Sequence, residues 1–294
     1  MSTVSRFEVQ RDHLMRVAYR LLGSHTEAQD AVQEAWLRWD AADHASIADD
    51  RAWLTTVTGR ICLDELRSAR VRRESYVGPW LPEPTVGTIA QADPAEAVVR
   101  GDEVSYALLV VLERLTPEQR VALVLHDVFA VPFDEIGGML GATAEAARQH
   151  ASRARRAVTA DGTPRHTADR AEQRRVLAAF ADAVVSGDLA ALAAVLAPDV
   201  VVTGDGGGQV PAGRHPVLGA DQVARLLIGL VRAYGQPGGG LELVLVNGDL
   251  GFLITYRRPD GTPARGIVAF AIADGRVTAV FNQLNPGKLG GLSA

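Results

Sequence analysis

The feature that most constrains this chain is the segment 132–158, PFDEIGGMLGATAEAARQHASRARRAV. Ile136 and Leu140 fall at helical spacing, and Gly141 follows where a first helix has to end and the chain has to turn sharply. Thr143 then offers a hydroxyl that can cap a second helix. The segment therefore predicts two short helices around a tight turn, a helix-turn-helix.

The second of these helices is strongly basic. Between residues 143 and 158, four arginines stand against one glutamate, a formal charge of +3 inside a chain whose net charge is −5. A helix of this kind suits phosphates and base edges in a DNA major groove. A solvated basic face on an ordinary amphipathic helix is the alternative, but the turn glycine, the cap and the apolar spacing together favour DNA binding.

Length and composition indicate two or three domains. The chain has 294 residues, of which 47% are hydrophobic, enough for substantial cores. A pI near 5.8 argues against a protein that coats nucleic acid indiscriminately, so DNA contacts should come from local basic surfaces. Cys62 is the single cysteine and cannot form an internal disulfide. No apolar run reaches the roughly 18 residues of a membrane span, so we expect a cytoplasmic protein.

The first predicted domain covers residues 5–75 and is helical. Apolar residues at helical spacing predict helices over 7–23 and 24–40, the second with an acidic face. A loop follows over 43–50, and a third helix begins at Arg51.

A linker is predicted over residues 76–95, where VGPWLPEPTVG leaves little room for regular structure. Its Trp80 is placed to dock on another surface rather than merely to tether. The second helical domain covers 96–158, and within it Thr116 predicts a helix start, with Gln119 as its capping-box partner.

The remainder changes character after a second linker over 159–168. Residues 169–285 predict two helices, a strand, a helix near 219–234 and four strand-like runs, with a tail over 286–294. Asn247-Gly248, Asp260-Gly261 and Asp274-Gly275 are hairpin signals between those runs. The expected fold class is therefore multidomain: two all-α domains and a C-terminal α+β domain with a curved, mostly antiparallel sheet.

Taken together, DAVQEAWLRWD, RAWLTTVTGRICLDELRSARVRRE, LERLTPEQRVALVLHD and the helix-turn-helix resemble regions 2 and 4 of an extracytoplasmic-function (ECF) sigma factor of RNA polymerase. The remainder resembles a SnoaL-like domain of the nuclear-transport-factor-2 (NTF2-like) superfamily. Sigma factors with this fused domain form a subgroup. The resemblance implies transcription initiation at specific promoters, with RNA polymerase core and promoter DNA as partners.

The resemblance implies roles for residues of region 2. The helix face with Asp30, Glu34 and Arg38 would bind the polymerase core, at its β′ clamp helices, with the β subunit as a further partner. The loop over 43–50 and the helix after it would hold the minus-10 promoter element. The residues expected there are Trp53, Thr56, Arg60 and Arg67. For Trp53, core packing is an equal alternative.

In region 4 the resemblance places the helix from Thr143 in the minus-35 major groove. Arg148, Gln149, Ser152 and Arg153 would face the bases, where Arg can read guanine and Gln can read adenine. Arg155 and Arg156 would grip the DNA backbone.

Three motifs resemble those of the fused subgroup, in the linker, in the C-terminal domain and near the end of the chain. They imply that the C-terminal domain controls sigma activity without a separate anti-sigma factor. We expect them to form or border one regulatory interface, with Gln209 departing from a pattern that has a basic residue there. Its residues are Trp80, Leu81, Pro82, Glu83, Pro84, Asp205, Gly206, Gly207, Gly208, Asn285, Pro286, Lys288 and Leu289.

Catalysis by the C-terminal domain is not expected. Asp205, His215, Tyr256 and Asn282 could supply chemistry inside a SnoaL-like cavity, but the sequence does not show that any two converge. No cofactor is expected, and no ligand spacing predicts a metal. The cavity still offers room for a small-molecule ligand.

Two alternatives remain open at this stage. One is a helix-turn-helix repressor or activator whose C-terminal domain senses a small molecule. The other is a SnoaL-like cyclase or isomerase with a helical appendage, which leaves both basic helices unexplained. The acidic helix over 27–38 discriminates against the repressor, which has no need of it.

Overall fold

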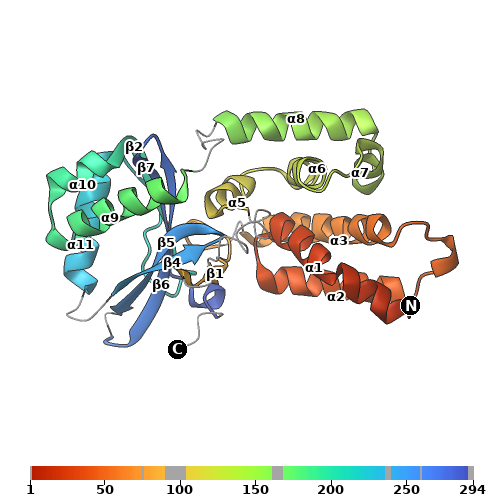
Figure 1. The fold of residues 1–294 in the computed structure, drawn as a ribbon, viewed down its shortest axis with the longest axis horizontal. Helices are drawn as coiled ribbons and strands as arrows, with labels where there is room; N and C mark the ends of the chain where they lie inside the picture. Colours follow the sequence, from red (N-terminus) through yellow and green to blue (C-terminus); the bar gives the residue numbers. More distant parts are fainter. Residues whose placement is uncertain are drawn as a thin grey trace. The chain divides into compact units, whose positions relative to one another are not determined.

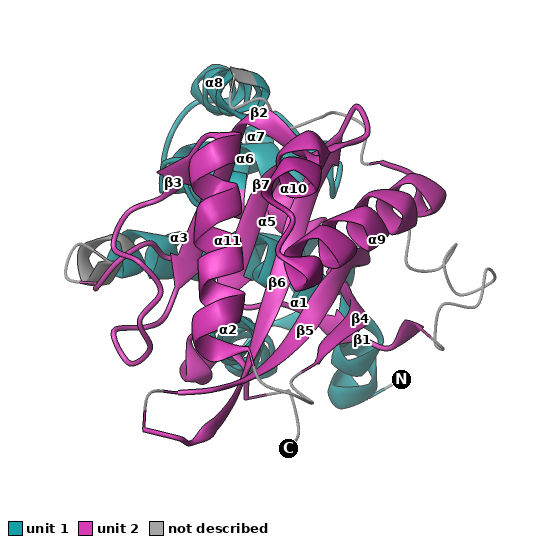
Figure 2. Cartoon of the chain, turned by 90° about the vertical axis from the view of Figure 1, so that its left-hand side faces the viewer, with its two compact units in different colours: residues 1–75, 111–162 teal, residues 76–110, 163–294 magenta. Residues whose placement is uncertain are grey.

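A computed structural model describes residues 2–73, 76–89, 104–160, 168–235, 240–258 and 260–290. It divides into two compact units (Figure 2). Unit 1 comprises residues 1–75 and 111–162, and unit 2 comprises residues 76–110 and 163–294. No helix in the described part of the chain is long and apolar enough to cross a membrane.

Unit 1 begins with three helices, as the sequence predicts: α1 (Thr3–Leu22), α2 (His25–Asp40) and α3 (Asp50–Arg73) (Figure 1). Gly23 ends α1 in the left-handed conformation at φ 71°, and Ser24 caps α2 by accepting a hydrogen bond from the Glu27 amide. A short 3-10 turn lies within the predicted loop. Leu14, Val17 and Trp39 are fully buried between these helices.

The rest of unit 1 contains the helix-turn-helix. This part of unit 1 contains the helices α6 (Pro117–Asp127), α7 (Phe133–Leu140) and α8 (Ala144–Ala160), of which α7 and α8 form the helix-turn-helix. The predicted capping box at Thr116 is present, and Gly141 turns the chain at φ 66°. Gly137 also requires glycine, because a Cβ there would lie 2.9 Å from the turn backbone around Ala142 to Ala144.

Both helical groups of unit 1 share one core. A Cβ at Gly59 of α3 would lie only 3.1 Å from the side chains of Leu125 on α6 and Met139 on α7. Arg120 and Glu113 form a buried ion pair at 2.8 Å. Close helix approach at Gly59 thus packs the first three helices directly against the helix-turn-helix group.

Unit 2 contains a seven-stranded sheet in the order β1-β4-β5-β6-β7-β2-β3. All neighbouring pairs are antiparallel except β2 with β7. Asn247 and Asp274 adopt positive φ at two of the predicted hairpin turns. This confirms the expected α+β fold with a mostly antiparallel sheet. The strands are β1 (Val86–Gly87), β2 (Leu196–Asp205), β3 (Val217–Leu218), β4 (Leu241–Val246), β5 (Asp249–Arg257), β6 (Pro263–Ala273) and β7 (Arg276–Gln283).

The sheet of unit 2 is buried on both faces. Helices α9 (Arg170–Ser186), α10 (Leu189–Val195) and α11 (Ala220–Tyr234) cover one face, against Phe270 and Val280 among others (Figure 2). The other face packs against linker residues, the tail and helix α5 (Tyr106–Leu112). Burial on both faces explains why GIVAFAIA in β6 is continuously apolar instead of alternating.

The linker differs from expectation in having regular structure. Val86 and Gly87 form strand β1, which pairs antiparallel with β4 at the edge of the sheet. Asn247 adds two hydrogen bonds to Thr85, one through its side chain and one through its amide. An edge strand presents unpaired backbone groups, and these fix the linker there. Residues 90–95 of the predicted linker and 161–167 of the second linker lie outside the described residues.

Candidate functional site

A buried carboxylate at the end of β2 gathers the linker and the tail. Asp205 is fully buried and accepts four hydrogen bonds. The donors are the Tyr76 hydroxyl at 2.5 Å, the Leu81 amide at 3.0 Å, the Gly207 amide at 3.0 Å and the Lys288 ammonium at 2.7 Å. We call these five residues the Asp205 cluster. A carboxylate with this many donors is fully satisfied in the absence of water.

Lys288 brings the only cation into this cluster. Its Nζ also donates to the Leu81 carbonyl at 2.6 Å and lies 3.1 Å from the ring centroid of Trp80. Its side chain is 9% exposed, so the ion pair with Asp205 is buried. Removing either partner would leave a charge uncompensated in a place that water does not reach.

Further bonds fasten the linker to the sheet and the tail. Gln283, at the end of β7, donates to the carbonyls of Leu81 and Pro82 at 3.3 and 3.1 Å. Tyr106 of α5 donates to the Pro82 carbonyl at 2.8 Å. Asn285 donates to the Tyr76 hydroxyl at 3.0 Å. The linker is therefore part of the C-terminal domain over residues 76–87.

The glycines after Asp205 allow the close approach of these segments. Gly207 adopts φ 62°, and a Cβ there would lie 2.5 Å from the Asn285 side chain in the tail. Gly208, at φ 71°, lies against Val77 of the linker. The structure thus brings together the three motifs that the sequence singled out. The remaining members lie as follows: Gly206, Pro82, Pro84 and Leu289 buried; Glu83 and Pro286 half-buried; Gln209 exposed.

The expected polymerase-binding face lies on the outside of α2. Asp30 and Arg38 are exposed, and Glu34 between them is partly exposed. Glu34 accepts a hydrogen bond from the Arg38 guanidinium at 3.1 Å. Leu37, beside Arg38, is 57% exposed, so this face combines charge with an apolar side chain open to a partner.

The expected minus-10 residues follow one side of α3. Trp53 and Thr56 are half-buried, and the Trp53 ring packs 5.5 Å from that of the buried Trp39. Arg60 donates to the Gly138 carbonyl of α7 at 3.4 Å, a long contact. Arg67 forms an ion pair with Glu118 of α6 at 3.0 Å, and the Glu118 pKa lies below its usual value. There, burial alone would raise that pKa, but hydrogen bonds and the Arg67 charge outweigh it.

The expected minus-35 residues lie on the solvent side of α8. Ala147, Ala151 and Ala154 are fully buried, which turns the basic side chains outward. Arg148 pairs with Glu145 within the helix, and Arg155 pairs with Asp127 of α6. The other expected residues lie as follows: Gln149, Arg153 and Arg156 exposed, Ser152 half-buried.

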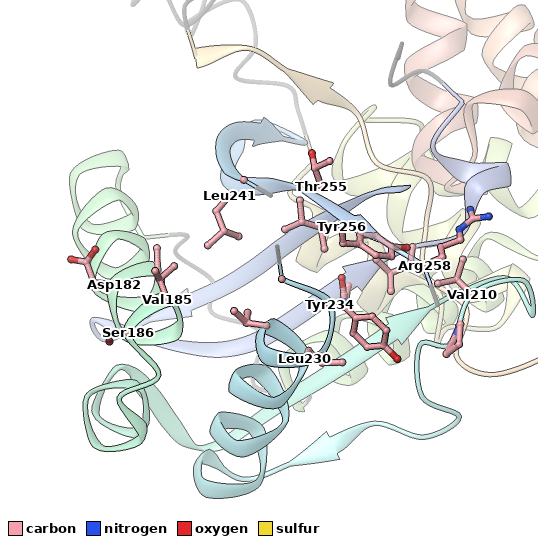
Figure 3. Close-up of a pocket in the computed structure, with 18 residues that line it drawn as sticks. Asp182, Val185, Ser186, Val210, Leu230, Tyr234, Leu241, Thr255, Tyr256 and Arg258 are labelled. Atoms are coloured by element: carbon pink, nitrogen blue, oxygen red, sulfur yellow. The ribbon is translucent and has the colours of Figure 1, made fainter. Parts of the chain in front are cut away.

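A cavity of about 610 Å³ opens in the C-terminal domain (Figure 3). Tyr256 and Asn282, two of the four residues considered for chemistry, both line it. Asp205 belongs instead to the Asp205 cluster, and His215 is exposed on a loop. Of the four candidates, Tyr256 and Asn282 therefore share the cavity, whereas Asp205 and His215 lie outside it.

Several residues of these sites were not identified from the sequence. Tyr76, Gln283 and Tyr106 hold the linker, and Arg258 lines the cavity. A polar Gln at the end of an apolar strand is the one local signal that could have indicated a buried partner. The others depend on contacts across more than 20 residues of sequence.

Three models of known families match parts of the chain. The family model described as Sigma-70 region 2 matches residues 7–72, and that described as Sigma-70, region 4 matches residues 105–158. The model described as SnoaL-like domain matches residues 177–280.

Relatives and a solved structure extend over almost the whole chain. The ECF RNA polymerase sigma factor SigJ of Mycobacterium tuberculosis is 49% identical, over 98% of this chain and 93% of the relative. The probable ECF RNA polymerase sigma factor SigI of the same species is 34% identical, over 98% and 95%. The crystal structure of M. tuberculosis SigJ superposes with a TM-score of 0.80, at 47% identity, over 98% of each chain. The repressor and the cyclase or isomerase alternatives are not favoured.

Proposed function

The chain belongs to the extracytoplasmic-function family of RNA polymerase sigma factors, and from this premise we propose that its own SnoaL-like domain controls its activity. As a sigma factor it directs RNA polymerase core to specific promoters and initiates transcription. The single observation that carries the proposal is the docking of linker residues 76–87, which lie between regions 2 and 4, on the C-terminal domain. Docking shortens the free chain between the two DNA-binding regions, and so limits the spacings they can adopt.

The packing inside unit 1 supports control of this kind. Arg60 and Arg67, the cations proposed for minus-10 DNA, contact region 4 helices. Phosphate binding competes with these contacts, because one guanidinium cannot serve both fully. We therefore propose that promoter binding separates α3 from α6 and α7, and that the docked linker sets how far they can separate.

For the polymerase, we propose that α2 binds the β′ clamp helices through Asp30, Glu34 and Arg38. The exposed charges and the exposed Leu37 support this, since a polar rim around an apolar contact is typical of protein interfaces. RNA polymerase works in the cytoplasm, so the proposal places the chain there. With its control built in, the chain would not require a separate anti-sigma factor.

For the minus-35 element, we propose a division of labour on α8. Arg148, with Gln149, Ser152 and Arg153, faces base edges, whereas Arg155 and Arg156 contact phosphates. Arg148→Ala should weaken binding by about 1–3 kcal/mol at one promoter position, whereas Arg156→Ala should weaken it uniformly across sequences. Footprints on a set of single-base promoter variants test this, and identical profiles for the two mutants would refute the division.

For the C-terminal domain, we propose binding rather than catalysis. The acid–base groups that line its cavity are Tyr234, Tyr256, Arg258 and Asp182, and Asp182 is exposed on α9. An apolar cavity of this size suits a small-molecule ligand that adjusts the domain's hold on the linker.

In-vitro transcription with RNA polymerase core tests the control. The full chain is compared with versions that end after Ala160 and before Asn285, and with Asp205→Ala in the full chain. Because each change removes linker contacts, promoter-specific transcript yield should differ several-fold from the full chain. Asp199→Ala, an exposed carboxylate on the same strand, should leave the yield unchanged. Equal yields from all versions would refute control by the C-terminal domain.

A further inference from the structure

The cavity of the C-terminal domain has mostly apolar walls and an apolar rim. It lies between α9, α11 and strands β5 and β7 (Figure 3). Val185, Val231 and Leu241 line it and are 69%, 38% and 36% exposed, respectively. Large aliphatic side chains left open to solvent around a hollow of about 610 Å³ are a feature of sites that receive an apolar ligand.

Among the polar side chains that line the cavity, three carry a buried polar atom without a hydrogen bond of normal geometry. Tyr256 and Arg258 are two residues apart along an extended segment, so they project from the same face, and Asn282 of β7 lines the same cavity. The Tyr256 hydroxyl, the Arg258 Nε and the Asn282 Oδ1 are buried and make no hydrogen bond of normal geometry among the described residues, although Arg258 lies close enough to Tyr256 to lower the pKa of its hydroxyl. A buried polar group without a partner destabilises the folded chain. Three of them around one cavity point to a missing polar partner.

The charge of that partner follows from the groups that face it. Arg258 has no ion pair with a carboxylate in the described part of the chain. The charge of Arg258 lowers the pKa of nearby Asp260, but Asp260 is exposed and accepts a hydrogen bond from the Thr262 amide. Asp182 lies on α9, on the other side of the cavity (Figure 3). Burial raises the pKa of Tyr256, so its hydroxyl stays a donor at neutral pH. The polar end therefore offers a cation and a neutral donor.

We propose that this cavity binds an amphipathic carboxylate, with its apolar body against the aliphatic walls and its carboxylate on Arg258 and Tyr256. Asn282 completes the polar end, because a rotated amide presents its NH₂ group instead of its oxygen. The half-buried Arg258 side chain is long and turns toward the ligand as it enters. The inference rests on the proposed ligand-binding role of the C-terminal domain and deepens it by naming the chemical class.

Calorimetric titration of the full chain with sodium decanoate, below its micellar concentration, tests the proposal. Decanoate should bind with one-to-one stoichiometry, and decanamide, which has the same chain without the charge, at least tenfold more weakly. Arg258→Gln should weaken decanoate binding at least tenfold. Arg257→Gln is the matched control, because the adjacent arginine is exposed and projects from the opposite face, and it should bind as the wild type does.

Two outcomes would overturn the proposal. One is the absence of saturable decanoate binding by the wild-type chain, and the other is equal affinity in wild type and Arg258→Gln. Ala181→Phe, which fills the cavity from α9, locates the site: decanoate binding that survives it lies elsewhere and also refutes the proposal. Thermal unfolding of each variant shows that it is folded. The binding experiment contains no polymerase, so decanoate binding can be confirmed even if the transcription experiment fails. Control of transcription by the C-terminal domain can likewise be confirmed even if decanoate does not bind.

Discussion

Two polar groups of side chains in the C-terminal domain differ in whether they are paired. In the Asp205 cluster the carboxylate accepts four hydrogen bonds, two from the linker, one from the tail and one from the Gly207 amide. Around the cavity, Tyr256, Arg258 and Asn282 each keep a buried polar atom without a hydrogen bond of normal geometry. Both groups lie on the same sheet, so the difference between them reflects their partners. Segments of the chain itself supply the partners of the Asp205 cluster, whereas the polar groups of the cavity would be paired by a bound ligand.

The largest effect should follow from removing the central acceptor of the paired group. Asp205→Ala leaves the buried Lys288 charge without its carboxylate and removes the acceptor of three other donors. The free energy of unfolding should fall by about 3–5 kcal/mol, measured by urea denaturation of the full chain. Asp199→Ala, exposed on the same strand, should change it by less than about 0.5 kcal/mol. Equal losses of unfolding free energy in the two variants would refute a stabilising role of the Asp205 cluster.

The same chemical change at two tyrosines contrasts the two groups directly. Tyr76→Phe removes a hydrogen bond to the Asp205 carboxylate and should destabilise the chain by about 1.5–3 kcal/mol. Tyr256→Phe removes a hydroxyl that makes no hydrogen bond of normal geometry, and should be neutral or slightly stabilising. Thermal unfolding measures both. If Tyr256→Phe were as costly as Tyr76→Phe, the unpaired state of the cavity would be refuted.

Two neighbouring glycines sharpen the account of how the segments meet. Alanine at either one is strained by positive φ, at about 1–2 kcal/mol. At Gly207 the new Cβ also displaces Asn285, which holds Tyr76 and the Gly287 amide, so about 1 kcal/mol more is lost. At Gly208 it meets Val77 at an ordinary 3.5 Å. Denaturation midpoints should therefore rank wild type above Gly208→Ala above Gly207→Ala; the reverse rank would contradict the contact with the tail.

The smallest effect concerns alkaline pH. Burial raises the pKa of Tyr256 above the value of 10.0 for a free tyrosine, although Arg258 lowers it. The folded chain then keeps this proton after the unfolded chain has lost it. The contribution to stability is therefore complete below pH 10 and is lost as pH rises through the folded pKa. The stability of wild type minus that of Tyr256→Phe should fall above pH 10; a difference that stays constant would refute the shift.

Local signals in the sequence were enough for most of the fold. The cap at Thr116, the turn at Gly141 and the hairpin at Asn247 depend on neighbouring residues, and all three are present in the structure. The strand at Val86 was not predicted, because its pairing partner Val246 lies 160 positions later in the chain. A two-residue strand has no periodicity of its own to detect.

The same distinction between local and long-range signals applies to the residues of the candidate sites. Residues in distinctive motifs, such as Trp80 and Lys288, could be singled out from the sequence, and the structure places them together. Gln283 offered only an ambiguous local signal and Arg258 offered none, because one isolated polar residue beside an apolar strand looks the same whether it is solvated or buried. Their roles depend on neighbours that only the folded sheet supplies.

The separation between the ends of the Asp205 cluster also sets an order of events during synthesis. Leu81 and Lys288, joined by a hydrogen bond, are 207 residues apart in the sequence. At about 5–20 residues per second, the ribosome takes roughly 10–40 s to travel between them. During that interval the ribosome has completed region 2 and goes on to complete region 4, but Lys288, which binds the linker, has not yet been made. Each newly made molecule therefore passes through a period in which its promoter-binding helices have been made but the contact between Lys288 and the linker has not.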